Sequence, residues 1–385
     1  MELFIEQCKY RYHHRIAHVL KLDTFHQTLT VNFGCKTGDR VVIATDDMPY
    51  LEPTEEFPDR ATLAEAIAAT GREAGLDTQT VSYPSTKGHG REPPKSVFDA
   101  VFPEGFTDFA VDSGLWEPLQ EKTIDKAGLE RLRSFLDGKP QATYATLIVS
   151  YFSTSHTRFR QLLNGTGTRL ATMPTGEPFI FEGVMSADWT AVARRGDAVK
   201  EALDQAVTAE ICSPGGRKLT MSLDGRPGFA CSGDLTKPGA FGNLPGGESY
   251  IAPMEGTAAG EVSIGYPDAP DGWAFRFDAG RLAEIIGNPP FQKELEQTLE
   301  RLPDARQLCE LGIGTNEKAT HYDNILEAEK MLGTVHFALG DNAGFGGAVK
   351  VPFHCDYVVH QPSLRLVQPD GSETVAIRDG HFLLA

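Results

Sequence analysis

The first half of the chain alternates short apolar runs with amphipathic segments, a pattern that predicts strands alternating with helices. We expect strands over residues 40–45, 78–83, 145–151 and 169–173, and helices over 62–74 and 157–163. Strands that alternate with helices form a mostly parallel sheet with helical crossovers. No G-x-G-x-x-G or G-x-x-x-x-G-K-[ST] segment follows these strands, so we expect an α/β domain without a nucleotide fingerprint.

Near residue 200 the pattern changes to strand signals separated by Gly-rich turns. Helices are expected over 198–206, 280–286 and 292–301, and strand signals fill 209–234 and 243–266. We therefore expect an N-terminal α/β domain over residues 1–200 and an α+β domain over 201–385. A length of 385 residues suits two domains of roughly 100–200 residues each.

Composition narrows the classes of protein that fit. The formal net charge is -17, which argues against nucleic acid as a partner, because phosphate binding needs clustered Lys and Arg. The same charge disfavours an anionic membrane surface, and no run approaches the ~20 apolar residues of a membrane span. The N-terminus carries no secretory signal pattern, and the six scattered cysteines show no C-x-x-C pair, so we expect a cytoplasmic protein.

The richest candidate chemistry lies in the last 140 or so residues. His354 and Asp356 fall in a strand-like run, where residues two apart point to the same face. An imidazole and a carboxylate that project together are suitable metal ligands. His336 lies in an apolar segment between glycines, where an unpartnered polar ring is costly. Each motif alone is also compatible with a purely structural role.

Two glutamates complete the set. Glu310 enters an apolar stretch that precedes a Gly-rich turn, and Glu248 follows another turn. Two Glu, two His and an Asp are a ligand set typical of two-metal hydrolases, which hold ions about 3.5–4 Å apart. Zn²⁺, Co²⁺ and Mn²⁺ accept this mixture of oxygen and imidazole. We therefore expect a metal-dependent enzyme that acts on a small molecule or short peptide.

The order of these motifs resembles the aminopeptidase T family of metallo-aminopeptidases. The family's N-L-P-x-x-E, E-x-G-x-G-x-N, H-x-A-L-G and H-x-D segments match residues 243–248, 310–316, 336–340 and 354–356, within a resemblance that covers about residues 205–365. The resemblance implies an α/β N-terminal domain, a two-metal site in the C-terminal domain and a homodimer. It also implies the following metal ligands, with Glu310 as a bridge or base: Glu248, Glu310, His336, His354 and Asp356.

The chain departs from the peptidase pattern in two ways. The family's catalytic Tyr after the H-x-A-L-G segment is missing, and Asn342 or Asn316 is our candidate for holding the oxyanion in its place. The acid that the peptidases place just before the His does not align, although Glu327 or Glu329 is a possible substitute. These departures bear on peptide cleavage more than on metal binding.

Two alternatives stay open beside an aminopeptidase or amide hydrolase. The chain is also similar to the 2,5-dihydroxypyridine dioxygenase branch, which opens an aromatic ring with one Fe(II) held by two His and an Asp, ligand types that His336, His354 and Asp356 supply. A mononuclear iron site does not need Glu248 and Glu310, which favours the hydrolase. The other alternative is a non-catalytic relative that keeps the metal site.

Overall fold

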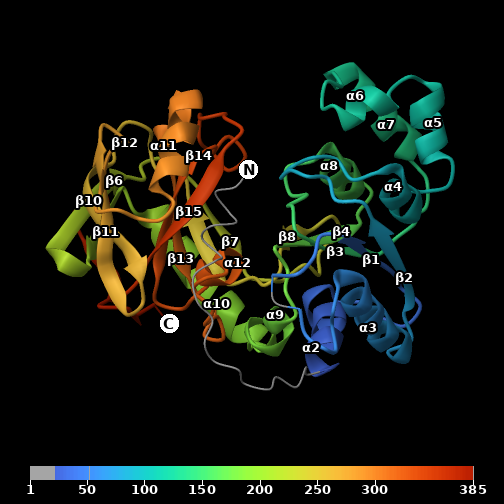
Figure 1. Cartoon of the computed structure of the whole chain (residues 1–385), viewed down its shortest axis with the longest axis horizontal. Coiled ribbons are helices and arrows are strands. Elements are labelled where there is room, and N and C mark those ends of the chain that lie inside the picture. Colours follow the sequence, from blue (N-terminus) through green and yellow to red (C-terminus); the bar gives the residue numbers. More distant parts are fainter. Residues whose placement is uncertain (1–21, 52, 385) are drawn as a thin grey trace. The chain divides into compact units, whose positions relative to one another are not determined.

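A parallel five-stranded sheet organises the first of the two units into which the chain divides (Figure 1). The computed structural model describes residues 22–51 and 53–384. Its sheet has the order β2-β1-β3-β4-β8, and every neighbouring pair is parallel. The strands are β1 (Arg40–Asp46), β2 (Asp77–Tyr83), β3 (Ala145–Ser150), β4 (Arg169–Pro174) and β8 (Phe241–Asn243). This confirms the predicted α/β fold class, and the strands predicted at 40–45, 78–83, 145–151 and 169–173 are present.

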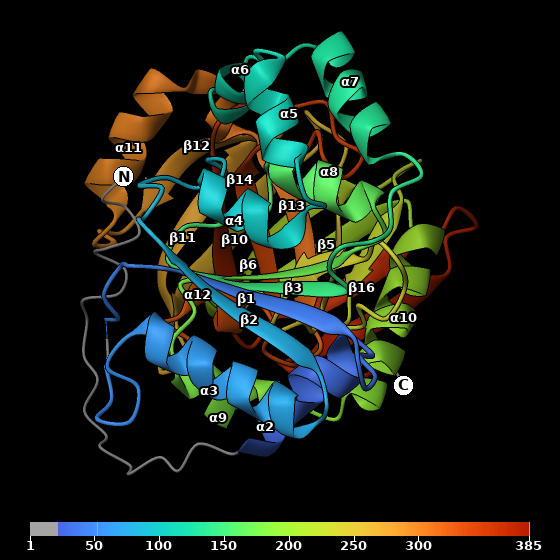
Figure 2. The same ribbon diagram turned by 90° about the vertical axis from the view of Figure 1, so that its right-hand side faces the viewer.

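Helices cover both faces of this sheet: α3 lies on one face and α4 and α8 lie on the other (Figure 2). The helix predicted from residue 62 begins at Arg60, because the Asp59 side chain caps it by accepting a hydrogen bond from the Thr62 N–H at 2.7 Å. The helices are α2 (Leu22–Gln27), a π-helical turn (Thr28–Asn32), α3 (Arg60–Glu73), α4 (Lys95–Val101), α5 (Phe106–Asp112), α6 (Trp116–Gln120), α7 (Lys126–Leu136), α8 (Arg158–Gly165), α9 (Phe179–Glu182) and a 3₁₀ turn (Val184–Ser186).

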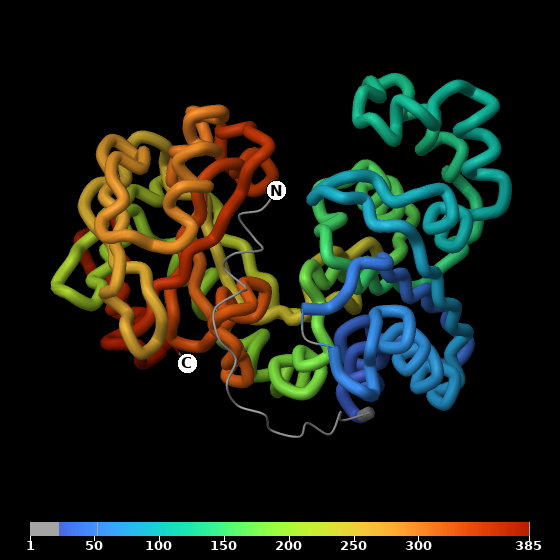
Figure 3. Tube along the Cα trace, viewed as in Figure 1, coloured from blue at the N-terminus to red at the C-terminus, as the bar shows by residue number. Residues whose placement is uncertain are grey.

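The first unit is discontinuous in sequence. It comprises the described residues up to Ser186 and also Gly233–Pro245, while the second unit comprises Ala187–Ser232 and the described residues from Gly246 onward. The chain returns to the first unit to add β8 beside β4, and its path can be followed in Figure 3. Residue 200, the boundary expected from sequence, falls inside α10 (Trp189–Gln205), which packs on β7 (Gly228–Cys231) and β9 (Glu248–Ile251) of the second unit.

The second unit is built from two antiparallel sheets of eight and five strands. The eight-stranded sheet has the order β12-β11-β10-β6-β5-β16-β17-β18, and the five-stranded sheet has the order β15-β14-β13-β9-β7. Its remaining elements are β5 (Thr208–Ser213), a 3₁₀ turn (Pro214–Gly216), β6 (Arg217–Ser222), β10 (Ala259–Tyr266), β11 (Ala269–Asp278), β12 (Arg281–Ile286), α11 (Gln292–Arg301), a second 3₁₀ turn (Pro303–Arg306), β13 (Leu308–Gly314), α12 (Ile325–Ala328), β14 (Val335–Gly340), β15 (His354–Val359), β16 (Ser363–Val367), β17 (Glu373–Arg378) and β18 (His381–Phe382).

One predicted helix is wrong. Within this range, Arg281–Ile286 forms strand β12, paired antiparallel with β11. Apolar Leu282, Ile285 and Ile286 have helical spacing, but Ala279 and Gly280 adopt positive φ and turn the chain back along β11. The helix predicted at 292–301 is confirmed as α11.

The core of the second unit lies between its sheets. Alternate residues of the five-stranded sheet, such as Leu311, Phe337 and Tyr357, are buried and stand opposite one another in register. Phe275 of the other sheet packs on this face, with its ring centroid 4.8 Å from that of Tyr357 and 5.9 Å from that of Phe337. Because side chains alternate along a strand, the intervening residues project from the opposite face.

In the part of the chain that the structure describes, no helix combines the length and apolar character needed to cross a membrane.

Candidate metal centre

The five-stranded sheet brings all five predicted ligands to one face. In register, Glu310 stands beside Ala338, which stands beside Asp356. His336 is opposite Gly312, and Glu248 is opposite Gly314. His354 is opposite Gly340. Since directly paired residues share a face, the two glutamates, two histidines and the aspartate converge on the side away from the core.

The positions opposite the ligands are small, which leaves room for the cluster. A Cβ atom on Gly312 would lie 1.9 Å from the His336 Nε2 atom, so the imidazole ring lies directly against the Gly312 backbone. A Cβ on Gly314 would lie 2.0 Å from the Met331 carbonyl oxygen. Glycine at position 312 therefore leaves space for the His336 ring, and glycine at position 314 lets the Met331 backbone pack closely. A side chain at either position would displace these groups.

The ligand atoms form two groups that share Glu310. Glu248, Glu310 and His336 make one group, and Glu310, His354 and Asp356 make the other, with the ligand atoms of each within 4.8 Å of one another. His336 Nε2 lies 3.2 Å from Glu248 Oε2 and 3.6 Å from Glu310 Oε1. His354 Nε2 lies 3.4 Å from Glu310 Oε2 and 3.5 Å from Asp356 Oδ1. Glu310 thus lies between the two imidazoles.

The environment of the histidines fits a divalent cation. His336 is fully buried and neither ring nitrogen makes a hydrogen bond, although two carboxylates lie within 3.6 Å of Nε2. A buried polar atom without a hydrogen bond is costly unless another partner satisfies it, and a metal ion is such a partner. His354 Nδ1 lies 2.9 Å from the Asp341 carbonyl oxygen, a contact that orients Nε2 toward the carboxylates, as is usual for metal-binding histidines.

Charges within the cluster hold it in an ionised state. Burial opposes ionisation of Glu310, but the neighbouring His336 and His354 outweigh it and lower the pKa of this carboxyl below its ordinary value. Burial likewise opposes ionisation of Glu248, whose pKa Lys330 and His336 lower. Burial disfavours a charged His336, yet Glu248 and Glu310 raise the pKa of its imidazole to about 10.

These pKa shifts predict that metal binding becomes tighter with rising pH. Burial opposes a charged His354, but Cys309 and Asp356 raise the pKa of its imidazole well above the ordinary value. Without metal, His354 therefore keeps its proton near neutral pH, and an incoming ion must displace that proton. Apparent affinity for Zn²⁺ should therefore rise between about pH 7 and pH 9, by up to roughly tenfold per pH unit for one released proton. Competition titrations with a chelator of known affinity measure this slope, and a pH-independent affinity would contradict the arrangement.

The structure adds a residue that the sequence did not single out. Lys330, two residues after α12, is fully buried, and its Nζ atom lies 2.7 Å from Glu248 Oε1. Lys330 also forms an ion pair with Glu329. Of the two acids proposed as substitutes for the family's missing one, Glu329 joins the cluster. Glu327 instead accepts hydrogen bonds from the Thr320 and His321 N–H groups at 2.6 and 2.9 Å.

Asn342 uses its amide group to order the loop after β14. Its Oδ1 accepts a hydrogen bond from the Val349 N–H at 2.9 Å, and its Nδ2 donates to Glu255 Oε1 at 3.1 Å. Nδ2 also lies 3.4 Å from the Cys309 carbonyl oxygen. An oxyanion-holding role would require these contacts to break.

Aromatic rings border the cluster. The Phe345 ring centroid lies 6.2 Å from that of His354 and 5.4 Å from that of Tyr250. Tyr250 shares the face of Glu248, two residues earlier on β9, and stacks on Phe229.

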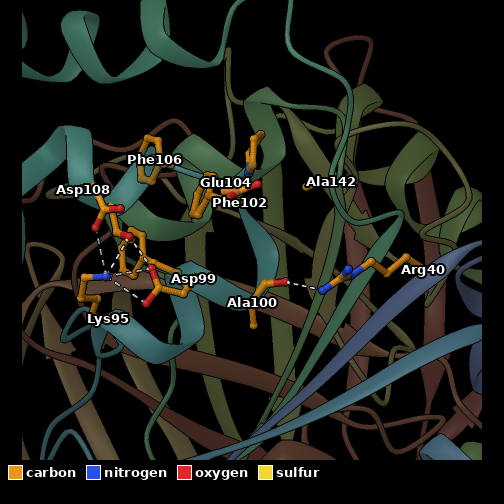
Figure 4. A pocket seen from close by; sticks show the side chains of 13 residues that line it. Arg40, Lys95, Asp99, Ala100, Phe102, Glu104, Phe106, Asp108 and Ala142 are labelled. Atoms are coloured by element: carbon orange, nitrogen blue, oxygen red, sulfur yellow. Dashed lines mark hydrogen bonds and ion pairs between the residues drawn. The ribbon is translucent and has the colours of Figure 1, made fainter.

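A hollow of about 440 Å³ in the first unit offers no comparable chemistry (Figure 4). Lys95 pairs there with Asp99 and Asp108, at 3.0 and 3.6 Å. Arg40 donates to the Gln79 side chain and the Ala100 carbonyl. The cluster in the second unit is therefore the candidate functional site.

The fold and the cluster define a two-unit α/β protein with a carboxylate–histidine centre on an antiparallel sheet. No protein-family model and no curated sequence matches the chain. Among solved structures, it is similar to the 2,5-dihydroxypyridine dioxygenase from Pseudomonas putida, with a TM-score of 0.65, 16% identity, and 94% of this chain and 97% of that chain covered. It is also similar to AmpT from Thermus thermophilus, with a TM-score of 0.59, 14% identity, and coverage of 94% and 98%. At these identities the likeness shows a shared fold.

Proposed function

We propose that the chain is a metal-dependent hydrolase that cleaves an amide or peptide bond in a small molecule or short peptide. The observation that carries this proposal is the convergence of Glu248 and Glu310 with three further ligands on one sheet face. Two buried carboxylates beyond a His, His and Asp set supply both a ligand and a proton acceptor. The shared fold with AmpT is consistent with this activity.

The cluster would hold divalent Zn, Co or Mn, which when bound supplies Lewis acidity toward water and a carbonyl group. Glu310 is the proposed general base. Its carboxylate lies between His336 and His354, which keep it ionised, so it is able to take a proton from water at neutral pH. Phe345 and Tyr250 would exclude bulk water from one side of the reaction. We assign Asn342 to ordering its loop, in place of the oxyanion role expected from sequence.

A second candidate is a ring-opening dioxygenase with Fe(II). The observation that favours it is the aromatic border: Phe345 lies beside His354, where a flat ring could stack, and the residues His336, His354 and Asp356 include the two-His, one-carboxylate ligand types of such enzymes. The shared fold with the 2,5-dihydroxypyridine dioxygenase is consistent with it.

The test compares both activities on one preparation. Metal-free protein would be loaded separately with Zn²⁺, Co²⁺, Mn²⁺ or Fe²⁺, then assayed with aminoacyl p-nitroanilides and dipeptides and, with oxygen uptake recorded, with dihydroxypyridines. We expect hydrolysis that requires Zn²⁺, Co²⁺ or Mn²⁺ and disappears in Asp356→Asn. Oxygen uptake with Fe²⁺ and no hydrolysis would favour the dioxygenase. Bound metal without either activity would favour a non-catalytic relative.

A further inference from the structure

We infer that the Lys330 ammonium takes the place of a second metal ion, so that the cluster binds a single divalent ion at Glu310, His354 and Asp356. This inference rests on the proposed metal centre and departs from the two ions that the resemblance implies. Three observations support it: the ion pairs of the buried Lys330, the backbone hydrogen bonds that fix its position, and the greater exposure of His354 and Asp356.

Lys330 is an unusual residue to find in this position. Its side chain is 0% exposed, and lysines are almost never fully buried unless they are paired. Its Nζ atom contacts two carboxylates, Glu248 and Glu329. Glu248 also lies 3.2 Å from His336 Nε2, so Lys330 reaches the group of ligands that a second ion would use.

The backbone fixes Lys330 at this point. The Asn316 N–H donates to the Lys330 carbonyl oxygen at 2.9 Å, and the Lys330 N–H donates to the Glu327 carbonyl at 2.9 Å. Gly314 lies against the next residue, Met331, so closely that a Cβ would lie 2.0 Å from its carbonyl oxygen. The segment is thus attached to the end of β13, the strand that carries Glu310, and the ammonium belongs to the cluster.

A two-ion centre would place one ion with Glu248, Glu310 and His336 and the other with Glu310, His354 and Asp356. An ion in the first group would share the Glu248 carboxylate with an ammonium that it repels. The second group contains no lysine or arginine. With one fixed and one exchangeable cation, the ammonium and the divalent ion do not share a carboxylate: Lys330 contacts Glu248 and Glu329, and the ion would lie with Glu310 and Asp356.

The solvent exposure of the side chains also distinguishes the two groups of ligands. The side chains of Lys330 and His336 are 0% exposed and that of Glu248 is 9% exposed. Those of His354 and Asp356 are 30% and 17% exposed. The first group is the closed end of the cluster and holds the fixed cation. The second group is the open end, where an ion and a substrate have access.

The test measures metal content and affinity, with no substrate present. Purified full-length protein is equilibrated with Zn²⁺ and separately with Co²⁺, and bound metal is determined by elemental analysis and titration calorimetry. We expect one ion per chain.

Two isosteric variants show where the ion binds. Asp356→Asn should weaken metal binding at least about 30-fold, because it removes a charged ligand of the occupied group. Glu248→Gln should weaken metal binding at most about threefold, because Glu248 lies outside that group. Lys330→Met, which frees Glu248 and Glu329, should bind a second ion.

The metal content and the affinities of the variants test the inference separately from the proposed function. Two ions per chain in the wild type, or equal losses in Asp356→Asn and Glu248→Gln, would overturn the inference while leaving a metal-dependent hydrolase intact. If Lys330→Met does not fold, the two isosteric variants still decide where the ion binds. One ion per chain without hydrolysis would support the inference and remove the proposed function. No bound metal in the wild type would remove both.

Discussion

Replacement of Glu310 by glutamine is expected to lower kcat/KM by about a thousandfold or more, the largest effect of any single substitution in this chain. Glu310 is shared by both ligand groups and lies within 3.6 Å of His336 and 3.4 Å of His354. A neutral amide of the same shape cannot accept a proton, and loss of a general base alone costs about 10²–10⁴-fold. Metal affinity should fall as well, since one anionic ligand is lost.

The measurement is kcat/KM on the best hydrolysable substrate, with bound metal determined on the same preparation. Glu300→Gln is a matched control, because Glu300 is an exposed residue at the end of α11 in the same unit. It should retain wild-type metal content and rate. Turnover by Glu310→Gln within about tenfold of wild type would exclude Glu310 as the base.

The second large effect is expected at a residue that has no side chain. In Gly312→Ala the new Cβ would lie 1.9 Å from the His336 Nε2 atom. The Gly312 backbone cannot retreat easily, because β13 is paired with β14 on one side and β9 on the other. The His336 ring must therefore leave its place between Glu248 and Glu310. The displaced ring no longer supports the ionised Glu310 carboxylate, from which it lies 3.6 Å in the wild type, so we expect activity to fall about 10–100-fold.

A double-mutant cycle tests whether Gly312→Ala acts through His336. If it does, adding Gly312→Ala to His336→Ala should cost almost nothing further, because the ring that clashes is already gone. Gly344→Ala serves as the control, since its Cβ would meet no atom within 4 Å. Unchanged activity in Gly312→Ala, or effects on activity that add fully in the double variant, would show that the glycine is not needed to hold the His336 ring in place.

Local patterns of apolar and polar residues predicted much of the fold and part of the candidate site. The apolar runs at 40–45 and 145–151 are β1 and β3, and the predicted alternation is the parallel sheet of the first unit. In the second unit, the spacing of His354 and Asp356 predicted a shared face, which the strand confirms. Such predictions succeed because the direction of a side chain along a strand depends only on the two-residue repeat.

Other features are absent from any local pattern. Four helices between residues 95 and 136 were not predicted, and the helical spacing at 280–286 was overridden by pairing with β11. The return of residues 233–245 to the first unit depends on the hydrogen bonds of β8 with β4. Contacts of this kind join residues distant in sequence, so propensity and periodicity say little about them.

The sequence by itself determined the candidate ligands: motif and strand spacing, together with the family resemblance, singled out Glu248, Glu310, His336, His354 and Asp356. Only the tertiary structure decided that they meet, because strand order and register place the five side chains on one face. It also decided the role open to Lys330, which reaches Glu248 through backbone pairing between Asn316 and its own carbonyl. Strand neighbours and loop docking are set by long-range hydrogen bonds and packing, which no local run of residues encodes.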